Sequence, residues 1–266
     1  MKTQQLLDGL YDKLNKRDLV DPDPLIFLYD FKDVKDREIV GLISSSVAYG
    51  RVAQILKSVA KLLKPMNGQP FEFIESSNEA EFLKIFKGFK HRFTTDEDIA
   101  TLFIGIKKAL KEYGSLENLF LSGKGKTTTE RLASFTSFIN GGKLCYLLPS
   151  PEKGSACKRL NLYLKWMVRS DNVDPGGWEK VDPADLIIPL DTHMHKASTL
   201  LRFTTRKAAD WKTALEITEE FRKISPKDPT KYDFALTRLG IRSEMSFDEL
   251  DLILTPSPKG KGSNYN

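Results

Sequence analysis

The sequence predicts an all-α fold, and three observations support this. Apolar residues recur at three- and four-residue steps along most of the chain, which is the spacing of one helix face. Extended segments of alternating apolar and polar residues are scarce. Several of the apolar segments begin at a side chain that caps helices or stop at glycine. From this periodicity we expect about ten helices.

The first helix is predicted by a single apolar stripe formed by Leu6, Leu7, Leu10, Tyr11 and Leu14. The DPDP sequence that follows is a break, because proline disfavours helix at the residue before it. Further helices are expected over residues 36–48, 51–63, 78–86, 95–113, 129–139, 155–169, 192–201, 211–223 and 229–239. Irregular segments are expected over 64–70, 122–129 and 170–189, and a disordered tail over 255–266.

The clearest helix signals lie between residues 95 and 114. The segment opens with TDEDIA, so acidic residues occupy the first turn, and it closes with Lys107, Lys108 and Lys111. This order of charges complements the helix dipole. Gly114 is expected to end the helix.

Composition limits the classes of protein that the chain can belong to. No apolar run approaches the roughly 20 residues of a membrane helix, and the N-terminus does not resemble a signal peptide, so we expect a cytoplasmic protein. Cys145 and Cys157 are too few for a four-cysteine zinc or iron–sulfur site, and we expect free thiols. The net charge of +5 favours a polyanionic partner only mildly.

The start of one expected helix carries the first chemical signal. Ser155, after Gly154, is expected to cap this helix and to leave its first N–H groups free for a phosphate oxygen. Lys158 then falls in the first turn, where the helix dipole and the charges of Lys153 and Arg159 favour the neutral amine. Because a neutral amine attacks carbon, Lys158 is a candidate nucleophile toward a sugar C1′. The alternative is an ordinary surface lysine.

A carboxylate at the start of another helix is the second signal. Asp191 follows Pro189 and precedes a helical segment, so its carboxylate is expected to accept N–H groups there. Such contacts hold the group in its ionised form, which can stabilise an oxocarbenium-like transition state or accept a proton. Simple helix capping is the alternative. His193 and His195 suggest a metal, but residues two apart on a helix do not face one another, and we expect no metal site.

These residues resemble a known superfamily. The segments GSACKRLNL (154–162) and LDTH (190–193) are similar to the helix-hairpin-helix DNA glycosylases, in which a glycine-rich hairpin leads into the helix of the catalytic lysine and a later segment supplies the catalytic aspartate. Lys158 and Asp191 fall on these two positions. The segments KGSACKRLNLYLKWMVR, IPLDTHMHK and DPTKYDFALTRLGI resemble more closely a bacterial family at the margin of this superfamily, whose function is not assigned.

A second resemblance lies upstream. The segment EIVGLISSSV (38–47) is similar to the endonuclease III helix that leads into the loop wedged into damaged DNA. Ser46 falls where that enzyme has its wedge glutamine. The resemblance therefore implies that Ser46, Tyr49 or Arg51 enters the space left by a flipped base.

The hairpin departs from the pattern of the superfamily. The usual sequence is leucine-proline-glycine-valine-glycine, whereas residues 148–154 read LPSPEKG and include Glu152, which would repel a phosphate. The insert 170–188 lengthens the distance between lysine and aspartate, as a long gap also does in archaeal 8-oxoguanine glycosylases. The four-cysteine cluster of endonuclease III is absent from the sequence, so no iron–sulfur cluster or other cofactor is expected.

The resemblance also implies the organisation of the chain. We expect one glycosylase-like unit over residues 1–254, made of two helical lobes with a cleft between them. One lobe, of the six-helix type, would span about 35–140, and the other would combine about 1–34 with about 141–254. We expect a monomer.

Excision of damaged bases from DNA, with an abasic-site lyase step as a further possibility, is the function that the resemblance implies. Damaged or abasic DNA would be gripped by Lys153, Gly154, Ser155 and Arg159, with His193 nearby. The target base would leave the stack, and candidates to pack against it are Tyr49, Phe93, Trp166, Trp178, Trp211 and Tyr232. Three alternatives stay open: a nucleic-acid-binding protein without catalysis, a metal enzyme that uses Asp191 and the two histidines, and a helical scaffold.

Overall fold

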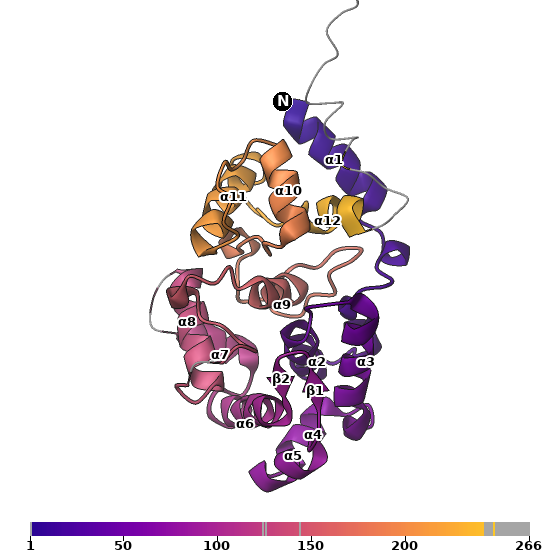
Figure 1. Ribbon diagram of the computed structural model, residues 1–266, viewed down its shortest axis with the longest axis vertical. Coiled ribbons are helices and arrows are strands. Elements are labelled where there is room, and N and C mark those ends of the chain that lie inside the picture. Colours follow the sequence, from indigo (N-terminus) through magenta and orange to yellow (C-terminus); the bar gives the residue numbers. More distant parts are fainter. Residues whose placement is uncertain (1, 124, 126, 144, 242–246, 248–266) are drawn as a thin grey trace, which may run out of the picture.

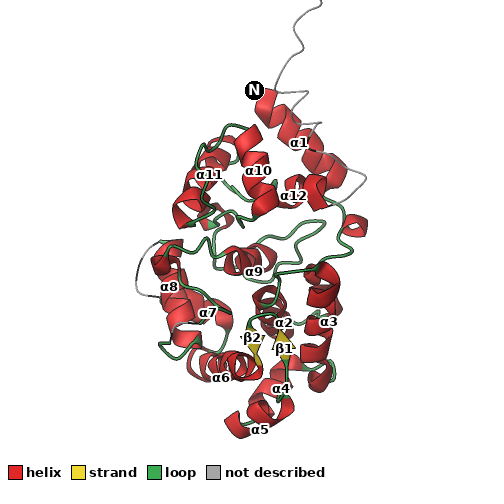
Figure 2. Cartoon of the chain, in the orientation of Figure 1, coloured by secondary structure: helices red, strands yellow, loops and turns green. Residues whose placement is uncertain are grey.

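The computed structural model describes residues 2–123, 125, 127–143, 145–241 and 247, and within them it confirms an all-α fold (Figure 1). The helices are α1 (Lys2–Leu14), α2 (Val34–Ser46), α3 (Val52–Leu63), α4 (Pro70–Ser76), α5 (Glu79–Ile85), α6 (Asp96–Tyr113), α7 (Leu116–Ser122), α8 (Thr128–Ile139), α9 (Lys158–Val168), α10 (Thr192–Leu200), α11 (Trp211–Ile224) and α12 (Asp233–Ile241). A short antiparallel hairpin pairs β1 (Lys90–His91) with β2 (Thr94–Thr95) (Figure 2). The tail expected over 255–266 lies outside the described residues.

Helix ends follow the local sequence where a polar cap is available. Asn78 and Thr95 form capping boxes at the starts of α5 and α6, each accepting an N–H of the first turn while an acidic side chain bonds back. Gly114 ends α6 with a φ of 77°, a conformation that glycine adopts at little steric cost. Asp191 caps α10, as the sequence predicts.

Several expected boundaries are wrong. Helix α9 does not begin at Ser155, because Cys157 takes the N-cap position with a left-handed φ of 48° and Lys158 is the first helical residue. Helix α12 begins at Asp233 rather than at Pro229. The sequence reasoning also missed the short helices α4 and α7 and the β-hairpin, because each is too short to show a period.

The helices form two groups on either side of α9 (Figure 1). Helices α2 to α8 lie below it in this view, and α1, α10, α11 and α12 lie above it. Helix α2 packs against α9, and α1 packs against α12, which brings the first described helix onto the last. The buried apolar side chains nevertheless form one continuous core, so the two groups are parts of a single folding unit.

A buried carboxylate ties the lower group to the irregular segment after α9. Glu38 of α2 accepts the main-chain N–H of Leu116 at 2.9 Å and of Glu117 at 3.3 Å, and the indole N–H of Trp178 at 3.0 Å. Burial raises the pKa of Glu38 to about 7, although these hydrogen bonds oppose the rise. The segment of the expected insert is therefore packed into the core through Trp178.

Candidate functional site

Lys158 and Asp191 lie at the starts of two helices that converge. Lys158 is the first residue of α9, and its Nζ lies 3.9 Å from Oδ2 of Asp191, the cap of α10. The Oδ1 atom of Asp191 accepts the N–H groups of His193 at 3.0 Å and Met194 at 2.9 Å. These two bonds fix the carboxylate, while Oδ2 is left to face the amine. The two side chains are 32% and 23% exposed, so both can meet a ligand.

An open cavity of about 320 Å³ lies over this pair. Its walls come from both groups of helices, because the loop between α2 and α3 and the start of α3 face residues of α9, α10 and α12 across it. A volume near 300 Å³ is at the lower end of pockets that hold small molecules. The lining residues are Pro22, Asp23, Pro24, Ala48, Gly50, Val52, Ile55, Lys158, Leu162, Asp191, His193 and Gly240.

A smaller cavity of about 50 Å³ lies deeper and shares Lys158 and Asp191 with the first. Asp233 and Arg238 of α12 also line it, and both are almost fully buried. Within the described part of the chain, Oδ1 of Asp233 and the Nε and Nη1 atoms of Arg238 have no hydrogen-bond partner. The third guanidinium nitrogen of Arg238, Nη2, donates to Oδ2 of Asp23 at 2.5 Å. The deep cavity is therefore polar, because two donor nitrogens and one acceptor oxygen in its lining residues have no partner among the described residues.

Lys165 and Asp233, which line the deep cavity, belong to a buried network of charged side chains. Lys165 of α9 donates to Asp174 at 2.9 Å and lies 3.5 Å from Asp233. Arg169 also pairs with Asp174, and it reaches Asp228 at 2.8 Å. Burial alone would lower the pKa of Lys165, but the carboxylates of Asp174 and Asp233 more than offset it and the pKa rises. The ammonium of Lys165 is held charged inside the protein.

Burial raises the pKa of two acids of this network, Asp174 and Asp233. The pKa of Asp233 rises to about 6, because burial and the carboxylates of Asp191 and Asp174 outweigh the effect of Lys165. Sequence reasoning missed Asp233 and Lys165, although Lys165 is seven residues after Lys158 and so lies on the same side of α9.

Two predicted DNA contacts are wrong. Ser46 is fully buried and its hydroxyl donates to the carbonyl of Leu42 at 2.6 Å, as expected of a serine that closes the last turn of α2. Arg159 is 8% exposed, and its guanidinium donates to the carbonyls of Ser46 and Tyr146. Arg159 turns into the core, because successive helical residues point about 100° apart and this side of α9 packs against α2.

In the hairpin predicted to bind phosphate, two residues already make hydrogen bonds within the protein. Gly154 has a φ of 79° and accepts the N–H of Trp211 at 3.1 Å. The hydroxyl of Ser155 accepts the N–H of Cys157 at 3.2 Å. Lys153 is exposed beside them, at the end of a 3-10 turn. Cys157 keeps its thiol proton, because burial raises its pKa to about 12.

The loop after α2 lines the open cavity through Ala48 and Gly50, and a second element accompanies it. The hydroxyl of Tyr49 donates to the carbonyl of His91 at 2.8 Å, which fixes the β1–β2 hairpin to this loop. Arg51 is exposed at the start of α3. Phe93, at the tip of the hairpin, is 67% exposed, and its ring lies edge to face with that of Tyr146 at 5.7 Å between centroids.

Arg92 joins this aromatic pair to the cavity. Its guanidinium lies over the ring of Phe93 at 5.6 Å, and its side chain approaches Gly50, where an added Cβ would meet it at 2.8 Å. Gly50 lines the open cavity. Phe93 and Tyr146 are therefore the exposed aromatic residues nearest the site along these contacts. Of the predicted stacking residues, Phe93 is exposed and Tyr49 is half-buried, and the remaining ones are core residues, namely Trp166, Trp178, Trp211 and Tyr232.

The histidines do not share a metal site. His193 lines the open cavity, whereas the Nε2 atom of His195 is 2.9 Å from the carbonyl of Arg206. Among the described residues, no group of three or more histidine, cysteine, aspartate or glutamate side chains is arranged to hold a metal ion. In the same part of the chain, no helix is both long and apolar enough to cross a membrane.

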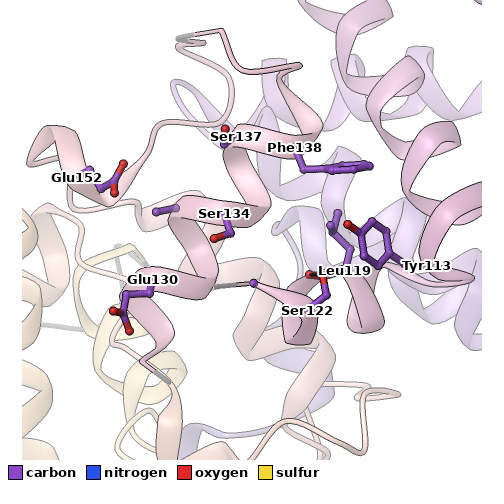
Figure 3. A pocket seen from close by; sticks show the side chains of 10 residues that line it. Tyr113, Leu119, Ser122, Glu130, Ser134, Ser137, Phe138 and Glu152 are labelled. Atoms are coloured by element: carbon purple, nitrogen blue, oxygen red, sulfur yellow. Dashed lines mark hydrogen bonds between the residues drawn. The ribbon is translucent and has the colours of Figure 1, made fainter. Parts of the chain in front are cut away.

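A larger cavity of about 650 Å³ lies elsewhere, against α7 and α8 (Figure 3). Its aromatic side is formed by Tyr113 and Phe138, whose rings meet edge to face, and Glu130 and Glu152 lie on the other side. Its lining residues among those described include two carboxylates and no lysine or arginine. Such a surface is unfavourable to phosphate, so the smaller cavity with Lys158 is the better candidate site.

The chain belongs to the DUF2400 family, whose description is a protein of unknown function and which matches residues 23–242. The match begins before α2, extends past the end of α12 and includes both Lys158 and Asp191. Neither a curated protein nor a solved structure matches the chain.

Proposed function

We propose that this protein excises bases from DNA, with Lys158 as the nucleophile and Asp191 as its electrostatic partner. The observation that carries the proposal is the meeting of the Lys158 amine and the Asp191 carboxylate, 3.9 Å apart, at an open cavity between two groups of helices. An amine and a fixed carboxylate at the starts of two helices are the groups that displacement at a sugar carbon requires.

The chemistry follows from the placement of the two groups. The neutral amine of Lys158 attacks C1′ of the nucleotide, the glycosidic bond breaks, and its electron pair leaves with the base. Positive charge develops on the sugar as that bond breaks, and the carboxylate of Asp191 is held near it by two main-chain N–H groups. The sugar ring then opens to a Schiff base, which can undergo β-elimination.

The exposed aromatic pair gives DNA a place to bind. Phe93 and Tyr146 offer exposed rings to an unpaired base, and Arg92 supplies positive charge beside Phe93. In Phe93→Ala we expect binding to DNA with one unpaired base to weaken by about 1–3 kcal/mol. Fluorescence anisotropy measures this, with Phe93→Tyr as the control that keeps a ring. Equal affinity of all three proteins would exclude a stacking role.

Covalent trapping tests the catalytic proposal directly. Borohydride reduction in the presence of DNA with an abasic site should join the protein to the DNA, and mass spectrometry should locate the bond at Lys158. Lys158→Gln should reduce the adduct to background. Lys212→Gln is the control, because it removes an exposed lysine of α11 that lines neither the open nor the deep cavity. Absence of an adduct under conditions where a known glycosylase is trapped would overturn the covalent mechanism.

Binding of nucleic acid without catalysis is the second candidate. The exposed rings of Phe93 and Tyr146 favour it, because they can stack on a base without the amine of Lys158. A protein of this kind would retard DNA in a gel but leave no covalent adduct.

A further inference from the structure

The deep cavity points to a second acid that acts through Lys158. Its polar lining is unusual, because a buried carboxylate oxygen and two guanidinium nitrogens have no partner within the described part of the chain. Unsatisfied polar atoms in a protein interior are commonly bridged by water. The cavity, at about 50 Å³, exceeds the roughly 10–15 Å³ that one water needs. We therefore expect at least one ordered water between Asp233 and Arg238.

Lys158 lines the same cavity, so we expect this water to lie near its amine. The Oδ1 atom of Asp191 is already used, because it accepts two main-chain N–H groups. Asp233 has a free Oδ1 and a contact of 3.5 Å from Oδ2 to Lys165, which orients the carboxyl group.

We propose that Asp233 takes up the proton that Lys158 sheds after it forms its bond to carbon, and that a water in the deep cavity carries this proton. The inference rests on the proposed function, since it assigns the proton acceptor for that covalent step. Asp233 contacts neither DNA nor base, and so it is a positioning residue that acts through the amine.

As the lone pair of Nζ forms the Nζ–C1′ bond, the glycosidic bond breaks and its electron pair leaves with the base. The nitrogen is then positively charged and carries two protons. One proton passes to the water, and the water gives one of its own to Oδ1 of Asp233. The lone pair restored on nitrogen then forms the C=N bond while the C1′–O4′ bond breaks, and O4′ takes a proton from solvent.

The electrostatics suit a proton acceptor near neutral pH. The pKa of Asp233 is raised to about 6, chiefly by burial. The groups that face it are Lys165 and Lys158 of α9, Asp191 at the start of α10, Asp174 of the insert and Arg238 of its own helix. A base is most useful when its pKa lies close to the working pH, because it is then ionised yet still able to hold a proton.

Imine formation with a small aldehyde tests the role of Asp233 independently of DNA. Acetaldehyde and cyanoborohydride would be added at pH 5 to 9, and mass spectrometry would follow alkylation at Lys158. In the natural protein the rate should rise through about pH 6. In Asp233→Asn this rise should disappear, and the rate above it should fall about a hundredfold. Asp228→Asn is the matched control, because it removes an acid from the Arg169 network without altering the cavity.

A second variant covers the case in which Asp233→Asn does not fold. Thr237→Ile keeps the acid but fills the deep cavity that Thr237 lines, so it should give the same loss of the rise near pH 6. An unchanged pH profile in either folded variant overturns the inference. If DNA with an abasic site gives no adduct while alkylation by acetaldehyde depends on Asp233, the proposed function fails and the role of Asp233 stands. If DNA with an abasic site gives an adduct but the variants keep the pH profile of the natural protein, the proposed function stands and the role of Asp233 fails.

Discussion

Two lysines on one helix differ in how deeply they are buried and in how closely carboxylates approach them. Lys158 and Lys165 are seven residues apart on α9, about two turns, and both line the deep cavity. Lys158 is about one third exposed and has a single carboxylate at 3.9 Å. Lys165 is buried, with one carboxylate at 2.9 Å and another at 3.5 Å. The buried lysine is held on all sides by the protein, whereas the partly exposed one can meet a ligand.

Replacement of the buried lysine should give the largest effect on stability. Lys165→Met keeps the length of the side chain but leaves Asp174 and Asp233 without their ammonium partner. Removal of one member of a buried ion pair costs about 3–5 kcal/mol, because an uncompensated charge stays behind. We expect a loss of this size in urea unfolding followed by circular dichroism. A loss below about 1 kcal/mol, the value for exposed pairs, would show that Lys165 is not held as the contacts indicate.

The pH dependence of stability should reveal the buried acid Glu38. Its pKa is about 7 in the folded protein against 4.5 in the unfolded chain, so the folded state binds the proton more tightly. The stability from this group is therefore complete below pH 4.5 and is lost as the pH rises through 7. The shift corresponds to a loss on the order of 3 kcal/mol.

The test of this prediction is a comparison of the natural protein with Glu38→Gln, which cannot ionise. The difference in unfolding free energy between the two proteins should change across pH 4.5 to 8, with the natural protein losing more. A constant difference over this range would mean that Glu38 keeps the same ionisation in the folded and unfolded states. Asp36→Asn, which changes a less buried acid on the same helix, serves as the control.

The smallest effect on stability is expected at the exposed lysine. Lys158→Met removes a partly exposed pair whose two charged atoms are 3.9 Å apart, and such pairs contribute about 0–1 kcal/mol. The variant should thus unfold at nearly the same urea concentration as the natural protein, while the adduct with abasic DNA disappears. A loss of stability as large as that in Lys165→Met would mean that Lys158 is a structural residue, and the distinction between the two lysines would fail.

The sequence predicted much of the fold from local signals. Helical periodicity and caps such as Asn78, Thr95 and Asp191 act within one or two turns, so they can be read without tertiary contacts. The pairing of Lys158 with Asp191 came from a resemblance, and the structure places the two side chains together. The β1–β2 hairpin and the shortest helices gave no usable period, since four to seven residues are too few.

Which charged residues face solvent was decided by the tertiary structure. Arg159 follows Lys158 directly, yet its guanidinium is buried against the carbonyls of Ser46 and Tyr146, because neighbours on a helix point in directions about 100° apart. Ser46 is buried for a similar reason, as α2 packs against α9. A sequence of basic residues shows that positive charge is present, but not which of its members can reach a phosphate.

The sequence by itself determined the all-α class, most of the helices and the two residues whose side chains meet at the cavity. Only the tertiary structure decided that Asp233 joins them, that Lys165 is buried and that Phe93 and Tyr146 are exposed beside the loop. The physical reason is that burial depends on what packs over a side chain. Residues from α9, α10 and α12 come together at the site, although 75 positions separate Lys158 from Asp233 in the chain.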